Sequence, residues 1–227
     1  MNFIVKNTTF PNPLALLAPH SCRGCGRIGE PLCNCCKNYI ILNHENYCPN
    51  CKNLNPTGKC PNCQNLPPIF VADQRSTLIG TLIHDYKYHS VRALSKSLAE
   101  ILNHILPLID GPVKIVPLPT INQHIHIRGF DHTYLIAKSL VKMRPNWQLE
   151  NLLLRSNNSV QVGSDAKTRL TQAKNAYALN PKISLNQSAT YLLLDDVWTT
   201  GASMQSAYQK LTQAGLSKII ITVLAVS

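Results

Sequence analysis

The chain has 227 residues, enough for one mid-sized domain and a small one, and its 22 Lys and Arg against 11 Asp and Glu give a formal net charge of +11. A basic chain attracts polyanions, so we expect nucleic acid or phosphorylated small molecules as partners, the alternative being a surface that is basic for solubility alone. Its apolar runs, such as residues 14–18, are far shorter than the ~18 residues of a membrane span, so the composition argues against a span or a cleaved signal peptide and predicts a cytoplasmic protein.

The nine cysteines all lie between residues 22 and 63. Eight of them form four C-x-x-C pairs, which are Cys22/Cys25, Cys33/Cys36, Cys48/Cys51 and Cys60/Cys63. Two thiolates at this spacing can bind one metal ion, and two such pairs complete a tetrahedral site, so the pattern predicts two zinc ions. The odd count and the repeated pairs argue against the alternative of a disulfide framework. Cys35, the ninth, either replaces a neighbour as a ligand or is none.

The four C-x-x-C pairs, or knuckles, can share their two metal ions in two ways. Consecutive pairs would form a double zinc ribbon, whereas alternating pairs would form a cross-brace. The segment is too small to bury a core of its own, so metal binding would supply most of its folding free energy. We place a cysteine-rich zinc-binding module at residues 1–70 and a second domain at 71–227. The stretch from Asn65 to Asp73, with Pro67 and Pro68, is interpreted as the linker.

Helices and strands are predicted to follow in turn. Apolar residues at helical spacing predict two helices between residues 76 and 106, and Lys87 between them either reaches an anion or is a solvated lysine. Val113–Pro117 is predicted as the first strand of the sheet. The basic loop behind it ends at Arg128, whose guanidinium suits a pyrophosphate. Asp131 is expected to cap the next helix, and His132 is interpreted as a surface residue.

Later segments complete the expected sheet. Leu152–Arg155 is predicted as a strand, and the polar loop at 156–174 is expected to close over a site. Lys218–Val226 is predicted as the last strand. Strands that alternate with helices from residue 113 onward predict an α/β fold with a parallel sheet and right-handed crossovers.

The stretch from Tyr191 to Ser203 reads YLLLDDVWTTGAS. Its apolar start is typical of a strand buried on both faces. Asp195 and Asp196 follow at the carboxyl end, where open α/β sheets bind ligands, and two carboxylates there can accept ribose hydroxyls or help to hold a hard cation. A helix is predicted from Ala202, so the loop before it meets the N–H groups of a helix N-terminus, which favour phosphate. The predicted phosphate-binding residues are Thr199, Thr200, Gly201, Ala202 and Ser203.

This stretch is also compatible with a structural interpretation, whereas a second kind of nucleotide site is not expected. An acidic turn and a capped helix can follow a strand in an α/β protein that binds no ligand there. A Walker-type nucleotide site is not expected, because the chain contains no G-x-x-x-x-G-K-[ST].

This stretch resembles the phosphoribosyl pyrophosphate (PRPP) motif of type I phosphoribosyltransferases, an apolar strand, two acids and then T-T-G-x-T or S. The resemblance implies that Asp195 and Asp196, the candidate catalytic residues, face the ribose hydroxyls and any Mg²⁺. It also implies that residues 199–203 wrap the 5′-phosphate. Arg128 and Lys87 are the further candidates for binding PRPP.

From about residue 20 to 226 the chain resembles the ComF/ComFC competence proteins and their GntX relatives. Their V-P-x-P and R-G-F-N-Q signature corresponds to residues 116–119 and 128–132, and their R…Q…R-x-x-N run is similar to Arg155, Gln161, Arg169 and Gln172. The chain departs from these patterns at Asp131, His132 and Gln172. The resemblance implies a type I phosphoribosyltransferase-like sheet with flanking helices, preceded by a small double zinc ribbon-like module.

The same resemblance implies a competence protein that handles incoming single-stranded DNA during natural transformation and has a PRPP-type pocket. The basic charge fits this function, because Lys and Arg neutralise phosphates without regard to sequence. One alternative is an active phosphoribosyltransferase that uses Mg-PRPP and a nitrogen nucleophile. Another is a zinc-knuckle adaptor that docks a helicase or another DNA-processing protein.

Overall fold

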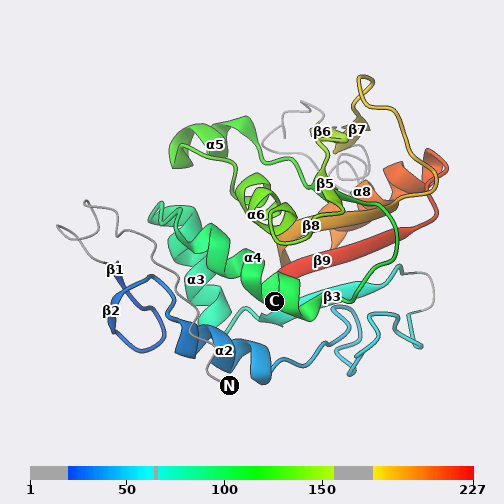
Figure 1. Ribbon diagram of the computed structural model, residues 1–227. Coiled ribbons are helices and arrows are strands. Elements are labelled where there is room, and N and C mark those ends of the chain that lie inside the picture. The colour runs from blue at the N-terminus through cyan, green and yellow to red at the C-terminus, as the bar shows by residue number, and fades with distance from the viewer. Residues whose placement is uncertain (1–19, 64–65, 156–175) are drawn as a thin grey trace, which may run out of the picture.

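A five-stranded parallel sheet forms the centre of the protein (Figure 1). The computed structural model describes residues 20–63, 66–155 and 176–227. The strand order is β3-β9-β8-β4-β5, with the bounds β3 Ile69–Gln74, β4 Val113–Pro117, β5 Trp147–Leu149, β8 Thr190–Trp198 and β9 Ile219–Val226. The predicted α/β class, a parallel sheet with flanking helices preceded by a cysteine-rich segment, is confirmed.

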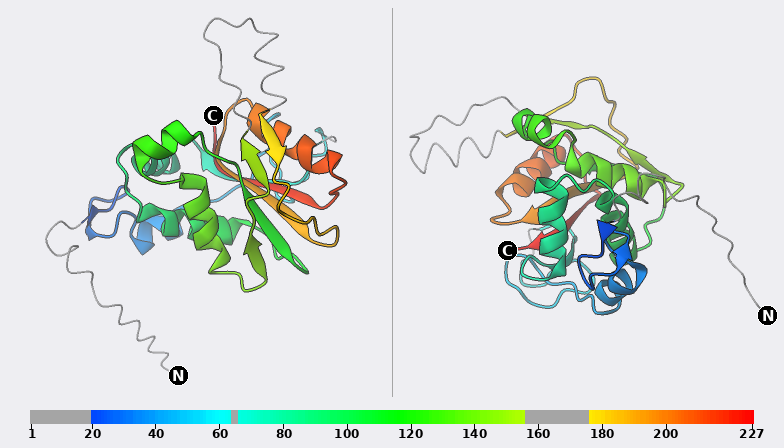
Figure 2. Two further views of the ribbon diagram at one scale, coloured as in Figure 1. Left: turned by 90° about the horizontal axis from the view of Figure 1, so that it is seen from above. Right: turned by 90° about the vertical axis from the view of Figure 1, so that its left-hand side faces the viewer.

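Helices cover both faces of this sheet (Figures 1 and 2). Helices α3 (Leu78–Tyr88), α4 (Leu94–Ile105) and α6 (His132–Val141) pack on one face, and α8 (Ala202–Gln213) packs on the other. Successive residues of β8 point to opposite faces, so Leu192 and Leu194 join the first core while Tyr191 and Leu193 join the second. The continuous apolar run arises because both faces of β8 are buried.

The order of the strands reverses between β4 and β8. From β4 the chain passes to β5 on one side, and it returns to β8 on the other side. The pairing of β4 with β8 stops at Pro117 and Leu194, whereas β8 stays paired with β9 as far as Trp198. Asp195 and Asp196 therefore lie beyond the end of β4, at the position where open α/β sheets form a ligand-binding crevice.

The first part of the cysteine-rich segment packs beneath the helices of the first face, and its second part lies along the edge strand β3 (Figure 1). The first part contains the short antiparallel pair β1 (His20–Ser21) and β2 (Ile28–Gly29) and the helix α2 (Asn34–Leu42). Leu32 and Ile40 are buried in the same core as α3 and α4, and Lys37 makes an ion pair with Glu100 of α4. The segment thus completes its core with residues from the rest of the chain, and a domain boundary near residue 70 stays a prediction.

Several predicted elements need correction. The predicted linker is wrong in its second half, because Ile69–Gln74 forms the strand β3, which pairs with β9. Since β3 comes earlier in the chain than Val113–Pro117, it is the first strand of the sheet. The predicted strand near Leu152 is β6 (Leu153–Arg155), which pairs antiparallel with β7 (Tyr177–Leu179) outside the central sheet. Trp147–Leu149, not predicted, forms the edge strand β5 instead.

The basic loop after β4 also contains an unpredicted helix, α5 (Asn122–Arg128), with no buried residue. The apolar run 14–18 and the loop 156–174, which includes Gln161, Arg169 and Gln172, lie outside the described residues. Within the described ranges, no helix has both the length and the apolar character needed to cross a membrane.

Candidate functional site

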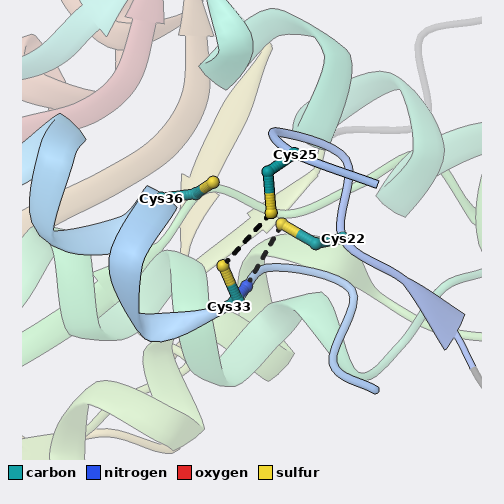
Figure 3. Close-up of side chains that lie close together, drawn as sticks. All are labelled: Cys22, Cys25, Cys33 and Cys36. Carbon is teal, nitrogen blue, oxygen red and sulfur yellow. Dashed lines mark hydrogen bonds between the residues drawn. The ribbon is translucent and has the colours of Figure 1, made fainter. Parts of the chain in front are cut away.

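Two four-cysteine clusters form from consecutive knuckles. Figure 3 shows the side chains of the first cluster, which comprises Cys22, Cys25, Cys33 and Cys36. The second comprises Cys48, Cys51, Cys60 and Cys63. In each cluster all four sulfurs lie within 4.8 Å of one another, and the Sγ atoms of Cys25 and Cys33 are 3.7 Å apart. Sulfurs at ~2.3 Å from a tetrahedral zinc ion stand ~3.8 Å apart, so both clusters fit a structural zinc ion.

The pairing of the knuckles is therefore consecutive, as in a double zinc ribbon, while Cys35 is exposed and belongs to neither cluster. Within the first cluster, the backbone favours the thiolate of Cys22, whereas burial and the neighbouring cysteines raise the pKa of Cys36. Burial acts to raise the pKa of Cys22, but hydrogen bonds from the backbone N–H groups of Cys33, Cys25 and Gly24 outweigh it and lower the pKa to about 6. A thiolate is the form that binds a metal.

Asp196 is the centre of a buried charged network at the end of β8. Its carboxylate is paired with the Nζ of Lys87 from α3 and lies 2.8 Å from Nε2 of His132 on α6. Burial acts to raise the pKa of Asp196, but His132 and Lys87 outweigh it and hold that pKa below its usual range. Asp196 is therefore ionised and is held by the charge of Lys87 from α3 and by a hydrogen bond from His132 of α6.

Asp195 behaves differently from its neighbour. Burial and the negative charge of Asp196 raise the pKa of Asp195 to about 8. The adjacent acids thus differ in protonation at neutral pH, one charged and paired and the other largely protonated. Such a split between two neighbouring carboxyls is typical of functional sites.

His132 links this network to Arg128. The Nδ1 of His132 lies 3.1 Å from Nη1 of Arg128, which ends α5 and also lies over the ring of Tyr88. A guanidinium group only donates, so Nδ1 accepts and the proton of the neutral ring sits on Nε2, facing Asp196. The interpretation of His132 as a surface residue is wrong, because its side chain is buried. The signal available in the sequence was its position directly after the helix cap Asp131, which accepts from the backbone N–H of Tyr134.

The loop between β8 and α8 turns at a glycine directly before the N-terminus of the helix. Gly201 precedes the helix with φ of 75°, in the left-handed region that glycine tolerates. A Cβ at this position would lie 2.4 Å from the indole ring of the buried Trp198. Thr199, Thr200, Ala202 and Ser203 are exposed around the helix N-terminus. Together with Asp195, these residues line a small cavity of about 50 Å³.

The candidate PRPP residues thus fall into two groups. Asp195, Asp196, Lys87 and Arg128 meet around the carboxyl end of β8, and the loop at 199–203 follows directly. A larger cavity of about 900 Å³ lies elsewhere, between residues 43–52, the edge strand β3 and the end of β9, and none of the predicted site residues lines it.

Comparisons with known proteins give one similar sequence and several solved structures. The chain is 26% identical over 157 residues to competence protein F of Haemophilus influenzae, covering 65% of this chain and 67% of that protein. No family model matches the chain. Among solved structures, hypoxanthine phosphoribosyltransferase from Trypanosoma cruzi in a ternary substrates complex is 12% identical, with a TM-score of 0.37 over 62% of this chain and 69% of that one. A second structure of the Trypanosoma cruzi enzyme is 15% identical, with a TM-score of 0.37 over 62% of this chain and 67% of that one.

The similarity to competence protein F, the two four-cysteine clusters and the parallel sheet confirm the resemblance stated from the sequence. The chain is similar to competence protein F, and a segment with two four-cysteine clusters precedes its α/β domain with a parallel sheet.

Proposed function

We propose that this chain acts in competence and binds Mg-PRPP at the carboxyl end of β8. One observation carries the proposal. An acid pair and a glycine turn at a helix N-terminus lie together where the strand order reverses, with Lys87 and Arg128 brought to the same place by other helices. Carboxylates beside a phosphate cradle and two cations are complementary to a phosphorylated ribose that carries a pyrophosphate.

Each group has a proposed role. Asp195 and Asp196 accept the ribose hydroxyls, and the N–H groups at the start of α8 bind the 5′-phosphate. Lys87 and Arg128 bind the pyrophosphate, and Mg²⁺ would supply further neutralisation of its charge. Because Lys87 is paired with Asp196 in the ligand-free protein, ligand binding requires that pair to open or to be shared. His132 keeps Asp196 hydrogen-bonded while this happens and holds Arg128 in place.

Replacement of both acids tests the ribose contacts. Asp195→Asn with Asp196→Asn removes the charge that faces the hydroxyls and leaves Lys87 without its partner, so affinity for Mg-PRPP should fall at least tenfold by calorimetry. The zinc content should not change, because both acids lie far from the cysteines in the sequence and belong to neither cluster. A folded double variant with wild-type affinity would show that the two acids do not bind Mg-PRPP.

We further propose that the basic surface binds single-stranded DNA. The net charge of +11 supports an affinity that depends little on sequence and falls steeply as salt rises. Fluorescence anisotropy with labelled oligonucleotides at several salt concentrations tests this, and no binding at low salt would contradict it. The double variant adds a second result. Retained DNA binding would mean that pocket and DNA surface are separate, whereas joint loss in a folded protein would mean that they overlap.

A phosphoribosyltransferase activity is the second candidate function. The raised pKa of Asp195 favours it, because a carboxyl with a pKa of about 8 can exchange a proton with a reacting group near neutral pH. In such a reaction a nitrogen nucleophile forms a bond to C1 of the ribose, and pyrophosphate leaves with the bonding electrons. Release of pyrophosphate from PRPP in the presence of candidate bases would establish the activity. PRPP binding without release would leave the protein as a binder of PRPP.

We also propose that the two cysteine clusters hold structural zinc ions. Their four-thiolate donor sets and sulfur separations support zinc over a harder metal. The ion of the first cluster would hold the part of the segment that packs in the core with α3 and α4, and the ion of the second cluster would hold the part that lies against β3.

A further inference from the structure

Three polar side chains gather at the C-terminal end of α3, outside the cysteine clusters and outside the acid pair at the end of β8. His84 and Asp85 belong to the last turns of the helix, and His89 follows it as the C-cap. Each offers one ligand atom, and these three atoms lie within 4.8 Å of one another. Two imidazoles and one carboxylate are a common donor set of metal sites with open coordination positions.

The distances fit a metal ion with little movement. Oδ1 of Asp85 lies 2.8 Å from Nδ1 of His89 and 3.7 Å from Nδ1 of His84. Even if the third separation is the full 4.8 Å, a point about 2.4 Å from all three atoms exists, close to the ~2.1 Å of zinc–nitrogen and zinc–oxygen bonds. Small side-chain rotations are enough to close the remaining gap.

Arg23 fixes the carboxylate in the orientation that a metal site needs. It stands between Cys22 and Cys25 in the first cluster, and its Nε is paired with Oδ2 of Asp85, whose other oxygen is thereby left facing the histidines. Asp85 is buried, with 6% of its surface exposed. Burial acts to raise its pKa, but hydrogen bonds from His89 and Arg23 outweigh it and lower that pKa, so the carboxylate is ionised. At metal sites, a residue that binds the ion is typically oriented by a second group that hydrogen-bonds to it from behind.

The surroundings also favour a cation with free coordination positions. The cluster lies at the C-terminal, negative end of a helix. Both histidine side chains are more than half exposed, and their ring centroids are 5.2 Å apart. We propose that His84, Asp85 and His89 form a third metal site, which binds one exchangeable divalent transition-metal ion such as Zn²⁺ and completes its coordination with water or a phosphate oxygen. Imidazole ligands favour Zn²⁺, Co²⁺ or Ni²⁺ over Mg²⁺.

The test uses the full chain after dialysis against a weak chelator, so that only the ions held by the four-cysteine clusters remain. Calorimetric titration with Zn²⁺ should then show one further ion per chain. His84→Ala and His89→Gln should each weaken this binding at least tenfold. His126→Ala is the matched control, because it removes an exposed histidine of α5 outside the cluster and should bind as the wild type does.

A second readout separates this site from the cysteines. Co²⁺ at the third site should give visible absorption without the intense thiolate charge-transfer bands of a cysteine site, and the two histidine variants should lose that absorption. Elemental analysis must show that both variants keep the cysteine-bound ions, which excludes unfolding as the cause. The proposal is overturned if the wild type takes up no further ion, or if the histidine variants bind it as tightly as His126→Ala does. Asp85 and His89 would then form an ion pair only.

Discussion

Gly201→Ala tests the phosphate loop with the smallest possible change. The added Cβ would meet the indole of Trp198 at 2.4 Å, and the residue must keep a φ of 75°. A left-handed φ costs a residue with a Cβ about 1–2 kcal/mol. Overpacking against a buried ring adds about 1–3 kcal/mol. We therefore expect the free energy of unfolding to fall by about 2–5 kcal/mol.

Gly111→Ala is the matched control for the backbone. Gly111 has a φ of 81°, but a Cβ there would meet no atom within 4 Å, so only the cost of about 1–2 kcal/mol remains. Urea denaturation of both zinc-loaded variants measures how far each lowers the free energy of unfolding. The difference between the two values isolates the contact with Trp198. Calorimetry on the same samples measures the affinity for Mg-PRPP. It should fall at least tenfold in Gly201→Ala, because the loop must move away from the ring, and stay unchanged in Gly111→Ala.

The two results are independent. Equal destabilisation of the two variants would show that the loop relaxes without cost and that the packing on Trp198 does not hold it. A wild-type affinity for Mg-PRPP in the Gly201→Ala protein would show that this turn does not bind the 5′-phosphate.

Three further predictions concern the metals, the acid pair and His132. Elemental analysis after dialysis against a weak chelator should find two zinc ions per chain, and a strong chelator should lower the free energy of unfolding; a folded, metal-free chain of unchanged stability would contradict this. Since the pKa of Asp195 is raised from 3.8 to about 8, the folded state keeps a proton that the unfolded state releases near pH 4, so the contribution of Asp195 to stability is lost as the pH rises towards 8. In Asp195→Asn, the free energy of unfolding measured by urea denaturation should therefore fall less between pH 5 and 8 than in the wild type. An unchanged pH dependence would refute the assignment. His132→Gln should keep the affinity for Mg-PRPP within a few-fold, because an amide can accept a hydrogen bond from Arg128 and donate one to Asp196. His132→Leu can do neither and should lower that affinity at least tenfold. Equal affinities of the two variants would mean that His132 does not position these residues.

The sequence predicted the parts of the site that are contiguous. The strand, the two acids and the glycine turn occupy one stretch of thirteen residues, and the backbone geometry of each follows from its local pattern. The network around Asp196 was not predictable in this way, because Lys87 and His132 come from helices more than 60 residues earlier in the chain. Only the packing of α3 and α6 on the sheet brings their side chains to the end of β8.

The limits of the fold prediction have the same origin. Ile69–Gln74 follows two prolines and resembles the end of a linker, and it becomes a strand through pairing with β9, about 150 residues further along the chain. The pairing of the knuckles was equally open, since C-x-x-C spacing is compatible with both arrangements. The turns that place Cys33 beside Cys22 decide it, with the backbone N–H of Cys33 donating to Sγ of Cys22 at 3.4 Å.

Calorimetric titration of the zinc-loaded wild-type chain with PRPP, in the presence and absence of Mg²⁺, tests the central claim most directly. We predict saturable binding of one PRPP per chain that is tighter with Mg²⁺. Ribose 5-phosphate should bind more weakly, because it lacks the pyrophosphate that Lys87 and Arg128 would hold. A folded, zinc-loaded chain that binds no PRPP at millimolar concentration would contradict it.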